Sequence, residues 1–133
     1  MTQLFNGRIS RVLLVQVITD TDGTQRWLLD GLFHRTDGPA VTWSSGIQCW
    51  YLYGRRHREN GPAVIWPNGS QEWYLNGLRH RTEGPAIIDT DGHQCWYLNG
   101  LRHRTDGPAV IRSDGHQEFW LNGVRVDPAG QPS

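Results

Sequence analysis

A unit of 23 residues recurs along this chain, and no other feature limits the fold as strongly. Gly-Pro-Ala and an aromatic residue both return at this interval. The aromatic residues are Trp27, Trp50, Trp73, Trp96 and Phe119. A tandem repeat of this length is one supersecondary unit that buries a core only by stacking on its neighbours. We therefore expect a single repeat domain over residues 1–133, with a degenerate capping half-repeat at 1–24, repeats at 25–127 and a tail at 128–133.

The composition of each unit predicts β-structure. The runs "PAVIW" and "QEWYL" are rich in β-branched and aromatic residues, and turn residues such as "PNG" and "SDG" separate them. Asn-Gly, as at Asn76, follows the main strand and is the strongest signal for a two-residue hairpin turn. "TDGP" predicts a further turn whose glycine takes a positive φ. Since no segment has a helical period, the repeats predict an all-β antiparallel meander.

Alternation along the main strand divides its residues between two faces. Gln71, Trp73 and Leu75 share one face, and their equivalents hardly change between repeats. We expect this face to be the packed one, with each Trp ring offset on its neighbours. Glu72 and Tyr74 share the other face, where we expect a partly exposed row of aromatic rings.

The second face carries most of the residues that differ between repeats. Stacking explains a residue that stays fixed, whereas a residue that varies reflects either a specific partner or tolerance of solvent. Aromatic and Arg side chains are enriched at interface hot spots. We expect a protein-binding surface formed by Trp43, Trp66, Tyr51, Tyr74, Tyr97, Trp120, Arg56, Arg79 and Arg102. A groove that stacks bases and contacts phosphates is an alternative, which the net charge of zero disfavours.

Two polar residues of the unit are candidates for chemistry, and both have a structural interpretation. The His residues lie one repeat apart, too far to share a zinc ion whose ligands sit at about 2 Å. We therefore expect no metal and no cofactor, and a structural His side chain that donates to a backbone carbonyl or to the next unit's turn. The Arg after each His precedes an Asp, Asn or Glu by two residues, so we expect it to hold a turn or a carboxylate. A row of anion-binding guanidiniums is the alternative.

Catalytic motifs are absent from the sequence, so we expect no enzyme. "GHQCW" places His93 before Cys95, but adjacent residues of a strand point to opposite faces, and we expect no catalytic pair. Cys49 and Cys95 occupy the same point of two non-adjacent repeats, so we expect free thiols, as in a reducing cytoplasm. We find no signal pattern and no apolar run long enough to span a membrane.

The unit "WYLNGLRHRTDGPAV" at 96–110 resembles the MORN-repeat superfamily. It is most similar to the variant whose units read "WYxNGxxHRxDGPAxI" in bacterial, phage and giant-virus proteins, which is related to antitoxin components of toxin–antitoxin systems. The resemblance implies an elongated, twisted, single-layer antiparallel sheet that binds other molecules. It suggests a cytoplasmic module that neutralises a toxin or, in a phage, inhibits a host defence protein. A scaffold that assembles through its edge strands is the alternative.

Overall fold

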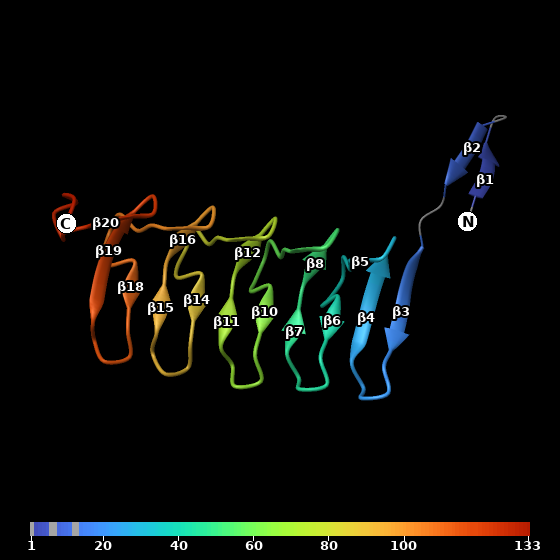
Figure 1. The fold of residues 1–133 in the computed structure, drawn as a ribbon, viewed down its shortest axis with the longest axis horizontal. Helices are drawn as coiled ribbons and strands as arrows, with labels where there is room; N and C mark the ends of the chain where they lie inside the picture. The colour runs from blue at the N-terminus through green and yellow to red at the C-terminus, as the bar shows by residue number, and fades with distance from the viewer. Residues whose placement is uncertain (1, 6–7, 12–13) are drawn as a thin grey trace.

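The computed structural model describes residues 2–5, 8–11 and 14–133, and this part of the chain contains strands and turns but no helix. Residues 1, 6–7 and 12–13 of the predicted capping half-repeat lie outside the described residues. One 12-stranded antiparallel sheet carries the repeats, and Figure 1 shows it as a row of hairpins that does not close on itself. The predicted fold class, an elongated single-layer antiparallel meander, is confirmed.

Neighbouring strands of the long sheet follow the chain, in the order β20-β19-β18-β15-β14-β11-β10-β7-β6-β4-β3. These strands are β3 (Val15–Thr19), β4 (Gln25–Leu29), β6 (Val41–Thr42), β7 (Gln48–Cys49), β10 (Val64–Ile65), β11 (Gln71–Glu72), β14 (Ile87–Ile88), β15 (Gln94–Cys95), β18 (Val110–Ile111), β19 (Gln117–Leu121) and β20 (Val124–Val126). Strand β5 (Leu32–Phe33) pairs with β4 outside this order.

Shorter hairpins extend the internal repeats beyond the long sheet (Figure 1). They pair β8 (Tyr51–Leu52) with β9 (Arg55–Arg56), β12 (Tyr74–Leu75) with β13 (Leu78–Arg79), and β16 (Tyr97–Leu98) with β17 (Leu101–Arg102). Near the N-terminus, β1 (Thr2–Phe5) pairs with β2 (Arg8–Arg11) in a hairpin that, among the described residues, joins no other strand. Each of the three internal repeats therefore supplies one hairpin of the long sheet and one short hairpin beside it.

The two-residue turns form where Asn-Gly predicts them. Asn76 and Gly77 have φ angles of 50° and 82°, the pair of positive values that a type I′ turn requires. The prediction for the glycine of Gly-Pro-Ala is wrong, because Gly84 and its equivalents are not among the positive-φ residues. A different requirement, the close approach of an Arg side chain, explains glycine at this position and is described below.

Two faces of the sheet differ in their residues, and we name them for their aromatic rings. The tryptophan face carries Trp27, Trp50, Trp73, Trp96 and Phe119. The tyrosine face carries Tyr51, Tyr74, Tyr97 and Trp120, together with the strand residues Val41, Cys49, Val64, Glu72, Ile87, Cys95, Val110 and Glu118. The register pairs these strand residues directly across neighbouring strands, and cross-strand partners share a face.

The better-buried face is the tyrosine face, which reverses our expectation for Trp73 and Tyr74. Tyr74 is 6% exposed and belongs to a cluster with Val41, Cys49 and Val64, whereas Trp73 is only half-buried. No ring pair between tryptophans is found among the described residues, so the expected Trp ladder is also wrong. Val41, Cys49 and Val64 cluster with Tyr74, whereas Trp73 is stacked against the guanidinium of Arg81.

Candidate functional site

The invariant residues of the tryptophan face form one small assembly in each repeat. The guanidinium of Arg81 lies 3.9 Å from the centroid of the Trp73 ring, and its Nη1 donates to the carbonyl oxygen of Pro85 at 3.1 Å. On its other side, a Cβ added to Gly84 would lie 3.2 Å from Arg81 Cζ. Glycine is therefore needed because the guanidinium packs against its Cα. The structural role that we expected for this Arg is confirmed.

The invariant histidines connect each repeat to the next. Nδ1 of His80 accepts a hydrogen bond from the backbone N–H of Asn99 at 3.0 Å, and His57 does the same for Asn76 at 2.9 Å. His34 and His103 repeat the contact with Tyr53 and Asn122. The bond goes to the next unit's turn, as expected, but His accepts it rather than donating to a carbonyl. Each of these rings therefore supplies one hydrogen-bond acceptor, Nδ1, to the next repeat.

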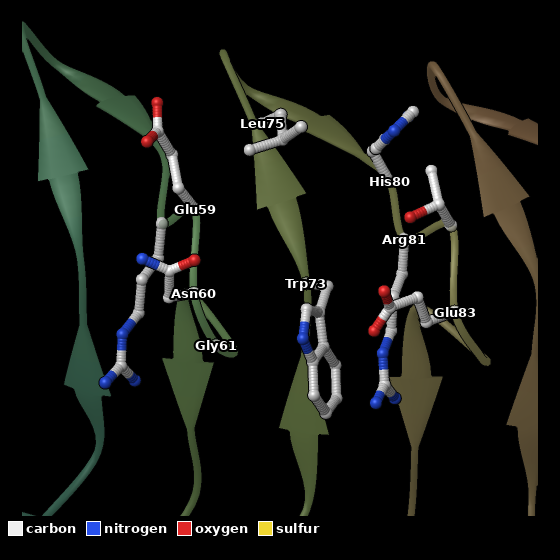
Figure 2. Close-up of a pocket in the computed structure, with 10 residues that line it drawn as sticks. Glu59, Asn60, Gly61, Trp73, Leu75, His80, Arg81 and Glu83 are labelled. Carbon is white, nitrogen blue, oxygen red and sulfur yellow. The ribbon is translucent and has the colours of Figure 1, made fainter.

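Grooves lie between successive repeats on the tryptophan face. One of them has a volume of about 530 Å³. Figure 2 shows that its Trp73 and Leu75 lie between Glu59 and Asn60 on one side and Glu83 on the other. Equivalent residues line a groove in the preceding repeat and another in the following one. Because the same polar groups recur in each groove, none of them is the unique constellation typical of an active site.

All nine residues predicted for protein binding lie on the opposite, tyrosine face. The register brings the Tyr and Arg residues together as cross-strand pairs: Tyr51 with Arg56, Tyr74 with Arg79, and Tyr97 with Arg102. Further contacts join one repeat to the next, because the guanidinium of Arg79 lies 5.8 Å from the Tyr74 ring and 5.6 Å from the Tyr97 ring. The result is a continuous row in which aromatic rings and guanidiniums alternate along the sheet.

Trp43 and Trp66 stand at the ends of β6 and β10, and Trp120 lies within β19. Trp43 and Trp66 are 43% and 40% exposed, respectively. The indole N–H of Trp66 donates to Oε2 of Glu72 at 3.0 Å, and that of Trp120 donates to Oε1 of Glu118 at 3.0 Å. The three indole rings thus border the Tyr–Arg row, and the first two have large exposed areas.

Two carboxylates that were not among the predicted site residues form hydrogen bonds and ion pairs on this face. Glu72 accepts a bond from the Tyr74 hydroxyl at 3.1 Å and lies 3.6 Å from Arg79. Glu118, which is buried, accepts from Trp120, from Arg112 at 3.0 Å and from His116. Both carboxylates stand two residues before an aromatic ring of the row, and this spacing could have identified them from the sequence.

Electrostatics at Glu118 favour the ionised carboxylate. Burial acts to raise the pKa of Glu118, but hydrogen bonds from Trp120, Arg112 and His116 outweigh it and lower this pKa to about 2. Arg102 lies 4.0 Å from the same carboxylate. Carboxylates of the same face therefore partly neutralise the positive charge of the row, which disfavours binding of a nucleic-acid backbone.

The two cysteines are free and buried, as predicted. Contrary to our expectation, His93 and Cys95 do meet: Nε2 of His93 lies 3.3 Å from Cys95 Sγ. They are two residues apart rather than adjacent, so they share a face. Burial raises the pKa of the Cys95 thiol, and charge interaction with Arg102 only partly opposes it. Burial likewise raises the pKa of Cys49. Both thiols are thereby made poor nucleophiles.

The fold and this face define a tandem β-hairpin repeat protein with one nearly invariant face and one variable face. No protein-family model matches the chain, and no curated protein is similar to it in sequence. In the described part of the chain, no group of His, Cys, Asp or Glu side chains could hold a metal ion. The residues that the structure describes form no helix able to cross a membrane. Inference about function therefore depends on the geometry of the two faces.

Proposed function

We propose that this chain is a non-enzymatic protein-binding module whose tyrosine face captures a partner protein. The observation that carries the proposal is that residues fixed between repeats and residues that vary have different surroundings. Residues fixed in every repeat have partners within the chain, as Arg81 has in Trp73 and Pro85. Residues that vary gather on the tyrosine face, where Trp43 and Trp66 leave apolar area open to solvent.

The chemistry of the tyrosine face suits a protein better than a nucleic acid. Aromatic and Arg side chains on a broad surface are the types that dominate interface hot spots. The guanidiniums of Arg79 and Arg102 are shared with Glu72 and Glu118, at 3.6 and 4.0 Å, so few of their charges are free for phosphates.

The MORN-like motif directs this proposal toward inhibition. A small module related to antitoxin components would act by covering a toxin, or a host defence protein if a phage encodes it. Free, buried Cys49 and Cys95 are in keeping with a cytoplasmic setting for this activity. No cofactor is required for such a role.

The test compares the two faces with matched substitutions. Trp43→Ala combined with Trp66→Ala removes exposed rings from the tyrosine face. The control combines Leu78→Ala with Leu101→Ala, which removes side chains of similar exposure, 49% and 48%, from the opposite face. We expect the Trp variant to bind its partner at least tenfold more weakly, a change of about 1.4 kcal/mol, and the control variant to bind like the wild type. Circular dichroism checks that both variants keep their fold.

Equal binding by the Trp variant and the wild type would contradict the proposal, as would equal losses in the Trp and Leu variants. Oligonucleotides provide the second arm of the experiment. Affinity for single-stranded DNA that falls steeply with salt concentration, with no protein partner bound, would instead support a nucleic-acid groove. Tyr74→Ala is not suitable here, because Tyr74 is buried and its removal changes stability.

A further inference from the structure

The two edge strands of the long sheet differ in the backbone contacts on their outer sides. At the C-terminal edge, the residues after β20 fold back onto its last residue: Val126 bridges to Pro132, and the N–H of Asp127 donates to the carbonyl of Gln131 at 2.7 Å. The side chain of Asp127 fixes this tail by accepting bonds from Ala129 and Gln131, both at 2.9 Å. At the other edge, β3 pairs with β4 alone, and no strand among the described residues pairs with its outer side.

Hydrogen-bonding groups of β3 face outward at alternate residues. The N–H of Trp27 donates to Ala40 at 2.7 Å and its carbonyl accepts from His34 at 3.0 Å, so the backbone of Trp27 faces away from β3. Val17 lies directly opposite Trp27. Pairs in an antiparallel ladder alternate between bonded and non-bonded, so Val17 is a non-bonded partner of β4. Its N–H and C=O, and by the same alternation those of its neighbours at positions 15 and 19, therefore face the open edge.

The side chains of β3 offer no protection to this edge. Its sequence, "VQVIT", has no charged residue and no proline, which are the usual means of blocking an edge strand. Val15 and Val17 are 43% and 56% exposed. They line a groove with Trp27 and Arg35 on the tryptophan face. With five residues, β3 is also longer than the two-residue strands of the internal repeats.

We propose that β3 pairs with β3 of a second copy of this chain, antiparallel and across a twofold axis at Val17. In this register Val17 faces the partner's Val17, Val15 faces the partner's Thr19, and Gln16 faces the partner's Ile18. The outward N–H and C=O groups at 15, 17 and 19 then meet their counterparts in hydrogen-bonded pairs. Apolar and β-branched residues meet on the tryptophan face, and no like charges oppose each other.

A second copy fits this edge because the strand is self-complementary about its centre. The pairing joins the two tryptophan faces into one continuous surface and likewise the two tyrosine faces. Since a twofold interface uses the same β3 edge of both copies, pairing through β3 gives a closed dimer and does not extend into a filament. The dimer also leaves both tyrosine faces uncovered, so it is compatible with partner binding there but does not depend on it.

Sedimentation velocity of the full chain across a dilution series tests the dimer with a matched pair of substitutions. Val17→Lys places two like charges at the twofold axis, whereas Val124→Lys places a charge on an equally exposed valine, 57% against 56%, at the other end of the sheet. We expect the wild type and Val124→Lys to sediment as dimers, and Val17→Lys to raise the dimer Kd at least tenfold while keeping the wild-type circular dichroism spectrum.

Cysteine cross-linking provides a second measurement that does not rely on disrupting the edge. Paired residues of a hydrogen-bonded antiparallel pair have Cα atoms about 5.5 Å apart, within the range of a disulfide. Val17→Cys should therefore oxidise to a covalent dimer, whereas Val124→Cys should not. The native Cys49 and Cys95 are buried, so they should not cross-link and obscure this difference. A wild type that stays monomeric throughout would overturn the proposal, and so would a dimer that Val17→Lys leaves intact. A monomer whose Val17 amide is protected from exchange would show that the chain's own N-terminal hairpin covers the edge, which also overturns it.

Discussion

Replacement of Gly107 by Ala tests the physical reason for glycine in the Gly-Pro-Ala motif. A Cβ at this position would lie 2.8 Å from Cζ of Arg104, so the guanidinium must leave its place. That guanidinium lies 4.0 Å from the centroid of the Trp96 ring, and its Nη1 donates to the carbonyl of Pro108 at 3.0 Å. Its Nε also bonds to Asp106 at 3.0 Å, but Asp106 is exposed.

The expected loss follows from these contacts. The cation–π stack contributes about 1 kcal/mol, the bond to Pro108 about 1 kcal/mol, and the exposed ion pair with Asp106 about 0.5 kcal/mol or less. Gly107 does not have a positive φ, so Ala is compatible with the backbone and offsets about 0.4–1 kcal/mol by restricting the unfolded chain. We expect Gly107→Ala to lower the free energy of unfolding by about 1–2 kcal/mol.

Urea denaturation of a double-mutant cycle decides whether the effect acts through Arg104. In an Arg104→Ala background the stack is already lost, so Gly107→Ala should be neutral or should stabilise the protein by about 0.4–1 kcal/mol. Gly84→Ala serves as a graded comparison and should cost less than Gly107→Ala, because its Cβ would lie 3.2 Å from Arg81 Cζ. Equal destabilisation by Gly107→Ala in both backgrounds would refute the reasoning.

Three further predictions concern burial, pH and the contact between repeats. Tyr74→Ala should lower the free energy of unfolding by about 3–5 kcal/mol, more than Trp73→Ala, in chemical denaturation; the reverse order would mean that the tyrosine face is not the buried one. The folded-state pKa of Glu118 is about 2, below the usual 4.5, so this carboxylate stabilises the fold above pH 4.5 and its contribution is lost as the pH falls toward 2. Glu118→Gln should therefore flatten the acid limb of a stability–pH curve, and an unchanged limb would contradict this. His80→Ala should lower the free energy of unfolding by about 1 kcal/mol and speed amide exchange at Asn99, and uniform acceleration at all the turn amides would argue against a local contact.

Repeat spacing and turn chemistry were sufficient to predict the strands, the meander and the two-residue hairpin turns. Burial was harder to predict, because period two shows which residues share a face but not which face is better covered. Trp73 and Tyr74 are both aromatic, and both positions change little between repeats. Only the three-dimensional packing shows that valine and cysteine side chains cluster with Tyr74. Near-invariance between repeats favoured the face of Trp73 as the packed one and gave the wrong order of burial.

Glycine and histidine differ in how far their roles can be predicted from the sequence. Glycine at position 84 is compatible with a positive φ or with the close approach of a side chain, and nothing local distinguishes them. The pair of His93 and Cys95, by contrast, was available from the sequence, since residues two apart in a strand share a face. The candidate site was predicted as a set of residues that did not include Glu72 and Glu118. Their spacing before an aromatic residue places them on this face, but which guanidiniums they approach, Arg79 and Arg102, depends on the three-dimensional structure.

Removal of one whole repeat tests most directly the claim that the invariant residues couple each repeat to the next. Deletion of residues 48–70 removes one 23-residue unit and keeps the spacing of all the remaining motifs. Urea unfolding followed by circular dichroism should show a folded β-protein with a lower midpoint than the wild type, because one set of contacts between repeats is lost. A lone unit, residues 71–93, should show no cooperative transition. An unchanged midpoint in the deletion variant, or a cooperative transition in the lone unit, would contradict the account.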